Sequence, residues 1–379
     1  MVAAGHSVDP ARWRETFDGL MARIAGRFRR VEPRRRARAF VLGLLADLPR
    51  KNCWTIAEHA GDRGPAGMQH LLRKAVWDTD AVRDDIRTIA VEHLGDTDAI
   101  LVVDETGDVK KGVCSVGTQR QYTGTAGRIE NAQVGVFLTY TTAVGHTLID
   151  RELYLPASWT GDPARCAVAG LPEDTVFATK TVLAQRMILR ALDGGVRAGW
   201  VTGDEVYGAA SRLRTALEER GVGYVLAVAC DHQVRTATGS HRVDAVTARL
   251  PKRAWQRLSA GEGAKGHRFY DWAWVGLVDG PDEPAGHRWL LVRRHRRTGE
   301  LGYFRCYAPG RVALAMLVRV AGRRWTVEES FQTAKGLAGL DKHQVRTWTS
   351  WYRWTTLSST GFDGGSDHPL GVDAGVLTR

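Results

Sequence analysis

The sequence predicts an α/β protein in which helices cover a mixed sheet, with an all-helical region before the sheet and a β-rich insertion within it. Three observations carry this prediction. Apolar residues recur at helical spacing in residues 1–95. Three strand-like runs and then alternating helices and strands fill residues 96–230, and tryptophan-rich strand-like segments occupy 231–312. A helical stretch over 313–357 would complete the core, before an atypical tail at 358–379.

The region 1–95 is predicted to be a helical DNA-binding domain. Residues 17–28 carry apolar side chains at helical spacing, and later short helices are separated by glycine and aspartate. Arginines are concentrated in residues 27–38, which would supply phosphate contacts. The alternative is a helical bundle whose arginines are only solvated, but their clustering favours DNA binding. The candidates for these contacts are Arg30, Arg34, Arg35 and Arg36.

The composition favours an anionic partner. The 379-residue chain has 53 lysines and arginines against 42 aspartates and glutamates, a formal net charge of +11, which favours nucleic acid. The apolar run at 312–318 is far shorter than the ~20 residues needed to span a bilayer, and the N-terminus does not have the pattern of a signal peptide. Five scattered cysteines match neither a zinc pattern nor a disulfide framework. We therefore expect a cytoplasmic protein with reduced thiols.

Two aspartates end predicted strands in the central region. The run "AILVVDETG" ends its apolar part at Asp104, and "AGWVTGDEVYG" places Asp204 at the end of another strand. Such side chains project at the rim of a sheet, so they would meet if the two strands were neighbours. Further strands are predicted at 133–142, 147–155 and 222–229, and helices at 180–195 and 209–221.

Helix geometry selects a third carboxylate in "RRWTVEESFQTAK", residues 323–335. At about 100° per residue, Arg324, Glu328 and Lys335 form one polar stripe beside an apolar stripe, whereas Glu329 is expected to point to solvent. Three carboxylates suit Mg²⁺ or Mn²⁺, and two such ions can activate a hydroxyl and stabilise the leaving oxygen at a phosphodiester. Arg324 and Lys335 would then contact DNA phosphates.

Each of these signals has a simpler interpretation. A strand-end aspartate is often only a turn residue, and a charged helix is usually a solvated face. "DETG" also hints at an aspartyl nucleophile of the phosphatase type, but the second aspartate of that pattern is replaced by Thr106. Two strand-end aspartates, a later helix glutamate and a basic helical N-terminus in this order favour metal-dependent chemistry on DNA.

These residues resemble the DDE transposases of bacterial insertion sequences, and more closely the group with a Tyr-Arg-Glu-Lys signature around the last carboxylate. The spacing of that signature is matched by Arg324, Glu328 and Lys335, whereas its tyrosine position is Ala321. The resemblance covers residues 20–353. Other matching segments are "VVDETGDVKKGVCSVGTQRQYTG", "ASWTGDPARCAVAGLPEDTVFATK", "VTGDEVYG" and "GLAGLDKHQVRTW".

The resemblance implies a ribonuclease-H-like fold in which Asp104, Asp204 and Glu328 bind two metal ions, Mg²⁺ or Mn²⁺. It implies cleavage at element ends, followed by attack of a 3′-hydroxyl on target DNA. The implied partners are double-stranded DNA, both terminal inverted repeats and target, and a second copy in a homodimer at the bacterial nucleoid. Aromatic residues that hold a flipped base are also implied, the candidates being Trp325 and one of Trp272, Trp274 and Trp289.

Two other functions are compatible with the sequence. An inactive or domesticated transposase-derived DNA-binding protein is favoured by Ala321 and by the tail, whereas the intact carboxylates favour activity. A plain ribonuclease-H-like nuclease would not need the insertion or the helical N-terminus. In the tail, clustered glycines and Pro369 disfavour a helix, so residues 358–379 are predicted to be disordered or loosely attached.

Overall fold

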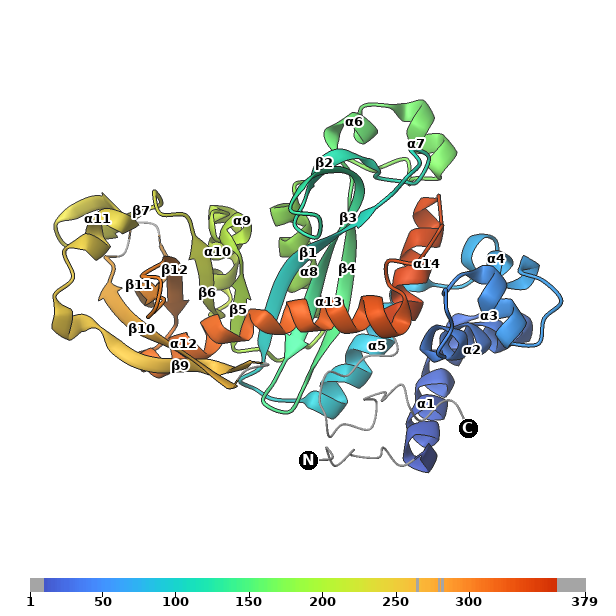
Figure 1. Ribbon diagram of the computed structural model, residues 1–379, viewed down its shortest axis with the longest axis horizontal. Coiled ribbons are helices and arrows are strands. Elements are labelled where there is room, and N and C mark those ends of the chain that lie inside the picture. Colours follow the sequence, from blue (N-terminus) through green and yellow to red (C-terminus); the bar gives the residue numbers. More distant parts are fainter. Residues whose placement is uncertain (1–9, 264–265, 279, 281–282, 360–379) are drawn as a thin grey trace. The chain divides into compact units, whose positions relative to one another are not determined.

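The computed structural model describes residues 10–263, 266–278, 280 and 283–359 (Figure 1). The chain divides into two units, which we describe separately. Unit 1 comprises Met1–Gly95, Glu105–Leu183 and Glu328–Arg379, and unit 2 comprises Asp96–Asp104 and Ala184–Val327. The boundaries fall within β1 (Ile100–Val109), α8 (Lys180–Asp193) and α13 (Trp325–Ala338), so these three elements contribute to both units.

The first part of unit 1 is helical. Asn52 and Asp78 cap two of its helices, because their side-chain oxygens accept hydrogen bonds from backbone N–H groups of the first turn. The helices share one apolar core, which also contains Trp354 and Leu357 from the far end of the chain. The elements are α1 (Pro10–Ile24), η1 (Ala25–Arg27), α2 (Val31–Leu45), α3 (Cys53–His59), α4 (Ala66–Arg73), α5 (Thr79–Leu94) and α14 (Trp348–Ser358).

Three antiparallel strands form the rest of unit 1 together with the second half of β1. The first part of β3 (Arg128–Thr141) pairs with β2 (Gln119–Thr123), and its second part pairs with β4 (His146–Tyr154). Strand β2 was not predicted, because its five residues are mostly polar and only partly buried. Two short helices, α6 (Ala157–Thr160) and α7 (Pro163–Ala169), follow β4.

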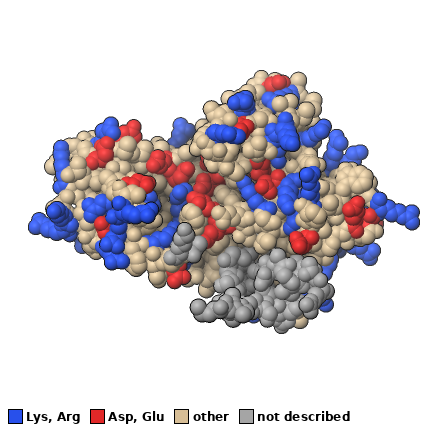
Figure 2. Space-filling view, viewed as in Figure 1, with Lys and Arg blue, Asp and Glu red and all other residues tan. Residues whose placement is uncertain are grey.

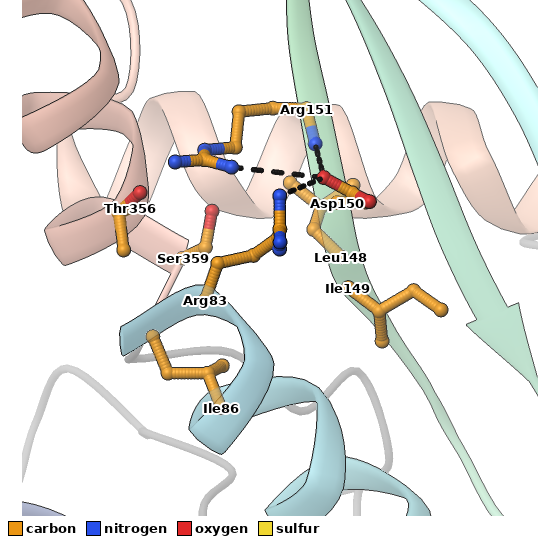
Figure 3. A pocket seen from close by; sticks show the side chains of 8 residues that line it. All are labelled: Arg83, Ile86, Leu148, Ile149, Asp150, Arg151, Thr356 and Ser359. Atoms are coloured by element: carbon orange, nitrogen blue, oxygen red, sulfur yellow. Dashed lines mark hydrogen bonds and ion pairs between the residues drawn. The ribbon is translucent and has the colours of Figure 1, made fainter. Parts of the chain in front are cut away.

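A buried ionic cluster joins α5 to β4 (Figure 3). The Asp150 side chain is fully buried, and its Oδ1 lies 3.5 Å from Nη1 of Arg83 and 3.6 Å from Nη1 of Arg151. Thr356 and Ser359 line the adjoining cavity of about 10 Å³, which has room for a single water molecule. The cluster therefore brings α5, β4 and the end of α14 together, because the buried carboxylate is stabilised by its two arginines.

Lys51 joins the helical region to the end of α13. Its ammonium donates to the carbonyl oxygen of Leu44, at 2.6 Å, and to that of Leu337. The residue is 4% exposed. Burial, together with the nearby Lys342, lowers the pKa of Lys51 from 10.5 to about 8.

We expect the stability of the wild-type protein, relative to Lys51→Met, to increase above pH 8. Below that pH, Lys51 is protonated in both the folded and the unfolded chain, so the cost of burying its charge is fully present. Between pH 8 and 10.5, the folded chain has lost a proton that the unfolded chain keeps, so the cost is relieved as the pH rises. Urea unfolding of both proteins at about pH 7 and about pH 9.5 measures this change. A stability difference that did not vary with pH would contradict it.

Unit 2 contains one mixed sheet. The first half of β1 is parallel to β5 (Trp200–Gly203), which is parallel to β6 (Gly223–Val228). Antiparallel strands then follow in the order β12 (Leu301–Ala308), β11 (His287–Arg294), β10 (Gly266–Gly276) and β9 (Gln256–Gly263). The strands of the predicted insertion thus extend the sheet that holds β5 and β6, and the α/β class is confirmed.

Helices and one hairpin accompany this sheet in unit 2. Buried Arg288 of β11 is joined to Glu218 of α10 by a 2.5 Å contact, and the Tyr224 hydroxyl of β6 donates to Glu218 at 2.6 Å. In the described part of the chain, no helix is both long and apolar enough to cross a membrane. The remaining elements are α9 (Glu205–Gly208), α10 (Ser211–Glu219), β7 (Gln233–Thr236), β8 (Gly239–Arg242), α11 (Val243–Ala248), η2 (Lys252–Ala254) and α12 (Leu314–Arg323).

Part of the predicted tail belongs to a helix. Ser358 is the last residue of α14 and donates its hydroxyl to the Trp354 carbonyl oxygen at 2.7 Å. Residues 360–379, which make up nearly all of the tail predicted to be disordered, lie outside the described residues.

Candidate active site

Asp104 and Asp204 directly follow the paired residues of two neighbouring parallel strands of unit 2. In the register of β1 and β5, Val103 pairs with Gly203, and the two aspartates are the next residues. Asp204 comes after the end of β5, whereas β1 continues through Asp104 to Val109, so the expectation that Asp104 ends its strand was wrong. The expectation that their strands are neighbours is met. The edge beyond the carboxyl ends of parallel strands is where open α/β sheets place their ligands.

The turn after β5 determines how Asp204 is held. Asp204 is the N-cap of α9, and its Oδ1 accepts hydrogen bonds from the backbone N–H groups of Val206 (2.9 Å) and Tyr207 (3.4 Å). Gly208 lets α9 lie against β6, because a Cβ at this position would be 1.7 Å from the Ala227 carbonyl oxygen. The carboxylate is therefore positioned by backbone contacts at the strand end rather than by a flexible loop.

Arg324 contacts the first aspartate. Its Nη1 lies 3.4 Å from Oδ2 of Asp104, and the two side chains are 35% and 14% exposed. Arg324 is the C-cap of α12 and directly precedes α13. A guanidinium beside a carboxylate at the sheet edge offsets negative charge there, and its remaining N–H groups can donate to an anionic oxygen.

The two glutamates of α13 lie in unit 1, and the expected exposure of Glu329 is found in part. Glu328 is partly buried, and the predicted apolar stripe is buried, as Phe331 and Ala334 show. Glu329 does not simply point to solvent. Its side chain is 44% exposed, and its Oε2 lies 3.5 Å from Nε2 of His146. His146 is held against the helix because its Nδ1 is hydrogen-bonded to Ser330 Oγ at 2.8 Å.

Lys335 is held by a buried carboxylate that the sequence analysis missed. Its Nζ lies 3.8 Å from Oδ1 of Asp108, and it donates to the Gly107 carbonyl oxygen at 3.5 Å. Oδ2 of Asp108 lies 3.3 Å from Nε2 of His343, whose side chain is fully buried. Burial acts to raise the pKa of Asp108, but His343, Lys110 and Lys335 together hold it below its usual value.

Burial chiefly lowers the pKa of His343, and its hydrogen bond with Asp108 opposes this shift. Lys110 also contacts this cluster, because its Nζ donates to the His343 carbonyl oxygen at 3.3 Å. Asp108 could have been suspected from the sequence, since it follows Asp104 by an even number of residues on one strand. No sequence signal pointed to His343.

The arginines of the predicted DNA-binding region differ in their surroundings. Arg30, the N-cap of α2, and Arg35 are exposed, and the described residues make no ion pair with either. Arg34 is partly buried. Arg36 is paired with Asp62 at 2.6 Å. Within the same stretch, further arginines are neutralised by carboxylates, in the pairs Arg27–Asp85 and Arg38–Asp18.

The four tryptophan candidates also separate by exposure. Trp325, the first residue of α13, is 41% exposed, and the Arg268 guanidinium lies 5.9 Å from its ring centroid. Trp272 is almost completely buried. Trp274 and Trp289 stack on each other, with centroids 5.7 Å apart. Packing therefore accounts for the three tryptophans of the insertion, and Trp325 is the one open to a ligand.

Asp104 and Asp204 bring the right donor chemistry for a divalent metal ion. Carboxylate oxygens are hard donors of the type that Mg²⁺ and Mn²⁺ prefer, and these two carboxylates come directly after the last paired residues of adjacent strands. Among the described residues, however, no three side chains of His, Cys, Asp or Glu are arranged as a ready metal site. The donor set fits a divalent cation without forming a complete ligand shell.

Comparison with known proteins identifies the family. A family model described as DDE superfamily endonuclease matches residues 23–259. The chain belongs to this DDE endonuclease superfamily. The match includes Asp104 and Asp204 and ends before Glu328. Membership in this superfamily implies dependence on a divalent metal ion.

A relative of this DDE endonuclease carries a more specific name. The chain is 28% identical over 202 residues to the probable transposase for insertion sequence element IS701 from Microchaete diplosiphon. The aligned part is 53% of this chain and 50% of the relative, so the chain spans about half the length of that protein.

Proposed function

We propose that this DDE endonuclease is a transposase that cuts DNA at the ends of an insertion sequence and joins them to target DNA. The observation that carries the proposal is the position of Asp104 and Asp204 directly after the last paired residues of β1 and β5, with Arg324 beside Asp104. The name of the IS701 relative supports the same activity. Glu328, one helical turn after Arg324 in the chain, is proposed as the third carboxylate.

Asp104, Asp204 and Glu328 would hold the divalent metal, Mg²⁺ or Mn²⁺, and we propose two ions. When bound, such ions supply Lewis-acid stabilisation of charge at a phosphodiester. The protein's own groups orient the DNA. Arg324 presents a guanidinium beside Asp104, which suits a phosphate oxygen of the cleaved strand.

Lys335 is proposed to contact a second phosphate. Its ammonium is a compact point charge, and Asp108 and the Gly107 carbonyl oxygen restrict where it lies. Asp108 therefore acts as a positioning residue, and His343 and Lys110 keep it ionised in its buried place.

Further DNA contacts are proposed for the helical region and the start of α13. Arg30 and Arg35 are exposed for phosphate contacts, and Arg34 and Arg36 lie on the same helix, α2. Trp325 would stack on a base displaced from the duplex. The partners are duplex DNA carrying terminal inverted repeats, target DNA and a second copy of the chain. The proposed location is the bacterial cytoplasm, on the nucleoid.

The proposal is tested by incubating the purified full-length protein with duplexes that carry the inverted repeats flanking its coding region. We expect cleavage at the repeat ends in Mg²⁺ or Mn²⁺ and none with EDTA, and joining of the released ends to a plasmid. A domesticated DNA-binding protein would bind the repeats without cutting them. A plain nuclease would cut unrelated duplexes equally well. Either result would contradict the proposed function.

A further inference from the structure

The outer strands of unit 2 carry an open basic face. Side chains alternate along a strand, and residues paired across strands share a face. Asp271 of β10 is paired with Arg257 of β9 and with Arg294 of β11, so all three project from one face. Phe269, two residues before Asp271, projects from the same face. The arrangement joins residues from three separate segments of the chain.

Only part of this face is covered. Towards the other end of β11, Val292 is buried against Val234 and Val243, so β7 and α11 cover that part. Arg257 is exposed and Phe269 is 43% exposed, so the end near them faces solvent. Figure 2 shows Lys and Arg side chains gathered around β9, β10 and β11, at the left of the view.

Two arginines on this face are stacked on aromatic rings. The Arg257 guanidinium lies 4.7 Å from the centroid of Phe269, and the Arg294 guanidinium lies 4.1 Å from that of Trp255. Stacking restricts these long side chains while their N–H groups still point outward at the ring edges. Since one face of each ring is occupied by an arginine, these rings are poor platforms for stacking bases.

One carboxylate, Asp271, is paired with two of the cations. Asp271 lies 3.0 Å from Nη2 of Arg294 and 3.6 Å from Nε of Arg296, whose side chains are 39% and 48% exposed. Lys252 and Arg253 of η2, directly before Trp255, are also exposed. We call this set the outer basic face: Lys252, Arg253, Trp255, Arg257, Phe269, Asp271, Arg294 and Arg296. The set holds five cations and one carboxylate, and a second carboxylate, Glu262 of β9, lies beside it opposite His267.

We propose that the outer basic face binds the phosphate backbone of duplex DNA. This inference rests on the proposed function and adds a second DNA-contacting surface, separate from the arginines of α2. Held guanidiniums suit phosphate oxygens, and the clear excess of positive charge matches a polyanion. Because phosphates carry no sequence information, the contact is independent of sequence and strongly dependent on salt.

The test measures the salt dependence of DNA binding by the full-length protein with Arg257, Arg294 and Arg296 all changed to glutamine. Each lost phosphate contact should lower the slope of log K against log salt by about 0.9, so the triple variant should lose roughly 2 to 3 from the slope. The loss should be the same for repeat-end DNA and for an unrelated duplex. Arg293→Gln is the matched control, since Arg293 is on the opposite face of β11 and lies over the Tyr270 ring at 5.0 Å.

A second variant tests the inference if the triple variant does not fold. Asp271→Asn removes the carboxylate of the face and should strengthen DNA binding at moderate salt; unchanged or weaker binding would overturn the inference. A triple variant with the wild-type slope would also overturn the inference, and so would an equal loss of slope in Arg293→Gln. Neither result would contradict the proposed function if the wild-type protein still cuts repeat ends. A wild-type protein that bound no DNA would overturn the proposed function as well, so the two failures are distinguishable.

Discussion

Asp104→Asn and Asp204→Asn should each abolish cleavage of repeat-end DNA while leaving DNA binding close to wild type. Asparagine keeps the shape of each side chain but removes the charge that attracts a divalent cation. A loss of at least about 10³-fold is expected, equivalent to ~4 kcal/mol of transition-state stabilisation. Asparagine is also a good N-cap, so Asp204→Asn should preserve the start of α9. Single-turnover cleavage and gel-shift binding measure the two properties separately.

The neighbouring glutamates provide the matched control. Glu328→Gln should abolish cleavage in the same way, whereas Glu329→Gln should change it only slightly, because Glu329 is paired with His146 and 44% exposed. Thermal unfolding of every variant checks that the fold is intact, since Asp104→Asn also removes a contact with Arg324. An inactive Glu329→Gln beside an active Glu328→Gln would show that the wrong glutamate was assigned.

Trp354→Ala should destabilise the protein by about 3–5 kcal/mol. Trp354 is 1% exposed and belongs to the core of the N-terminal helices. Its ring packs edge-to-face on Phe40, at 5.4 Å between centroids, and its indole N–H donates to the Gly339 carbonyl oxygen at 3.2 Å. The substitution would leave a cavity and remove the indole hydrogen bond, and urea unfolding would measure the loss.

Trp54→Ala is the control for this prediction. Trp54 lies in α3 of the same helical region but is 59% exposed, so its truncation should change stability by no more than about 0.5 kcal/mol. Equal losses for the two variants would mean that α14 does not complete the helical core. The contribution of α14 also means that a fragment of residues 1–95 would lack part of its own core.

Local patterns in the sequence identified many of the elements that form the candidate site. The apolar runs ending at Asp104 and Asp204 predicted strands because a buried strand needs continuous apolar side chains, and both strands are present, although β1 continues beyond Asp104 to Val109. The 3.6-residue period predicted the helix that carries Glu328. The excess of arginine and lysine indicated an anionic partner without showing which surface meets it. These signals are local, so they can be interpreted without knowing what packs against what.

Pairing between distant segments was decided only by the tertiary structure. The adjacency of β1 and β5, and the contact of Arg324 with Asp104, depend on which strands and helix ends meet. Helical angles placed Glu329 in solvent because they cannot show that β4 brings His146 to that side of α13. For the same reason, the sequence could not show that His343 is buried beside Asp108.

The outer basic face shows this division most clearly. Composition recorded its arginines, but the register of β9, β10 and β11 determines that Arg257 and Arg294 share a face and that Arg293 does not. A shift of one residue in either pairing would reverse those faces. The sequence by itself therefore determined the kinds of element and the chemistry available to them. Long-range packing decided which side chains act together, because contacts between distant segments have no period in the sequence.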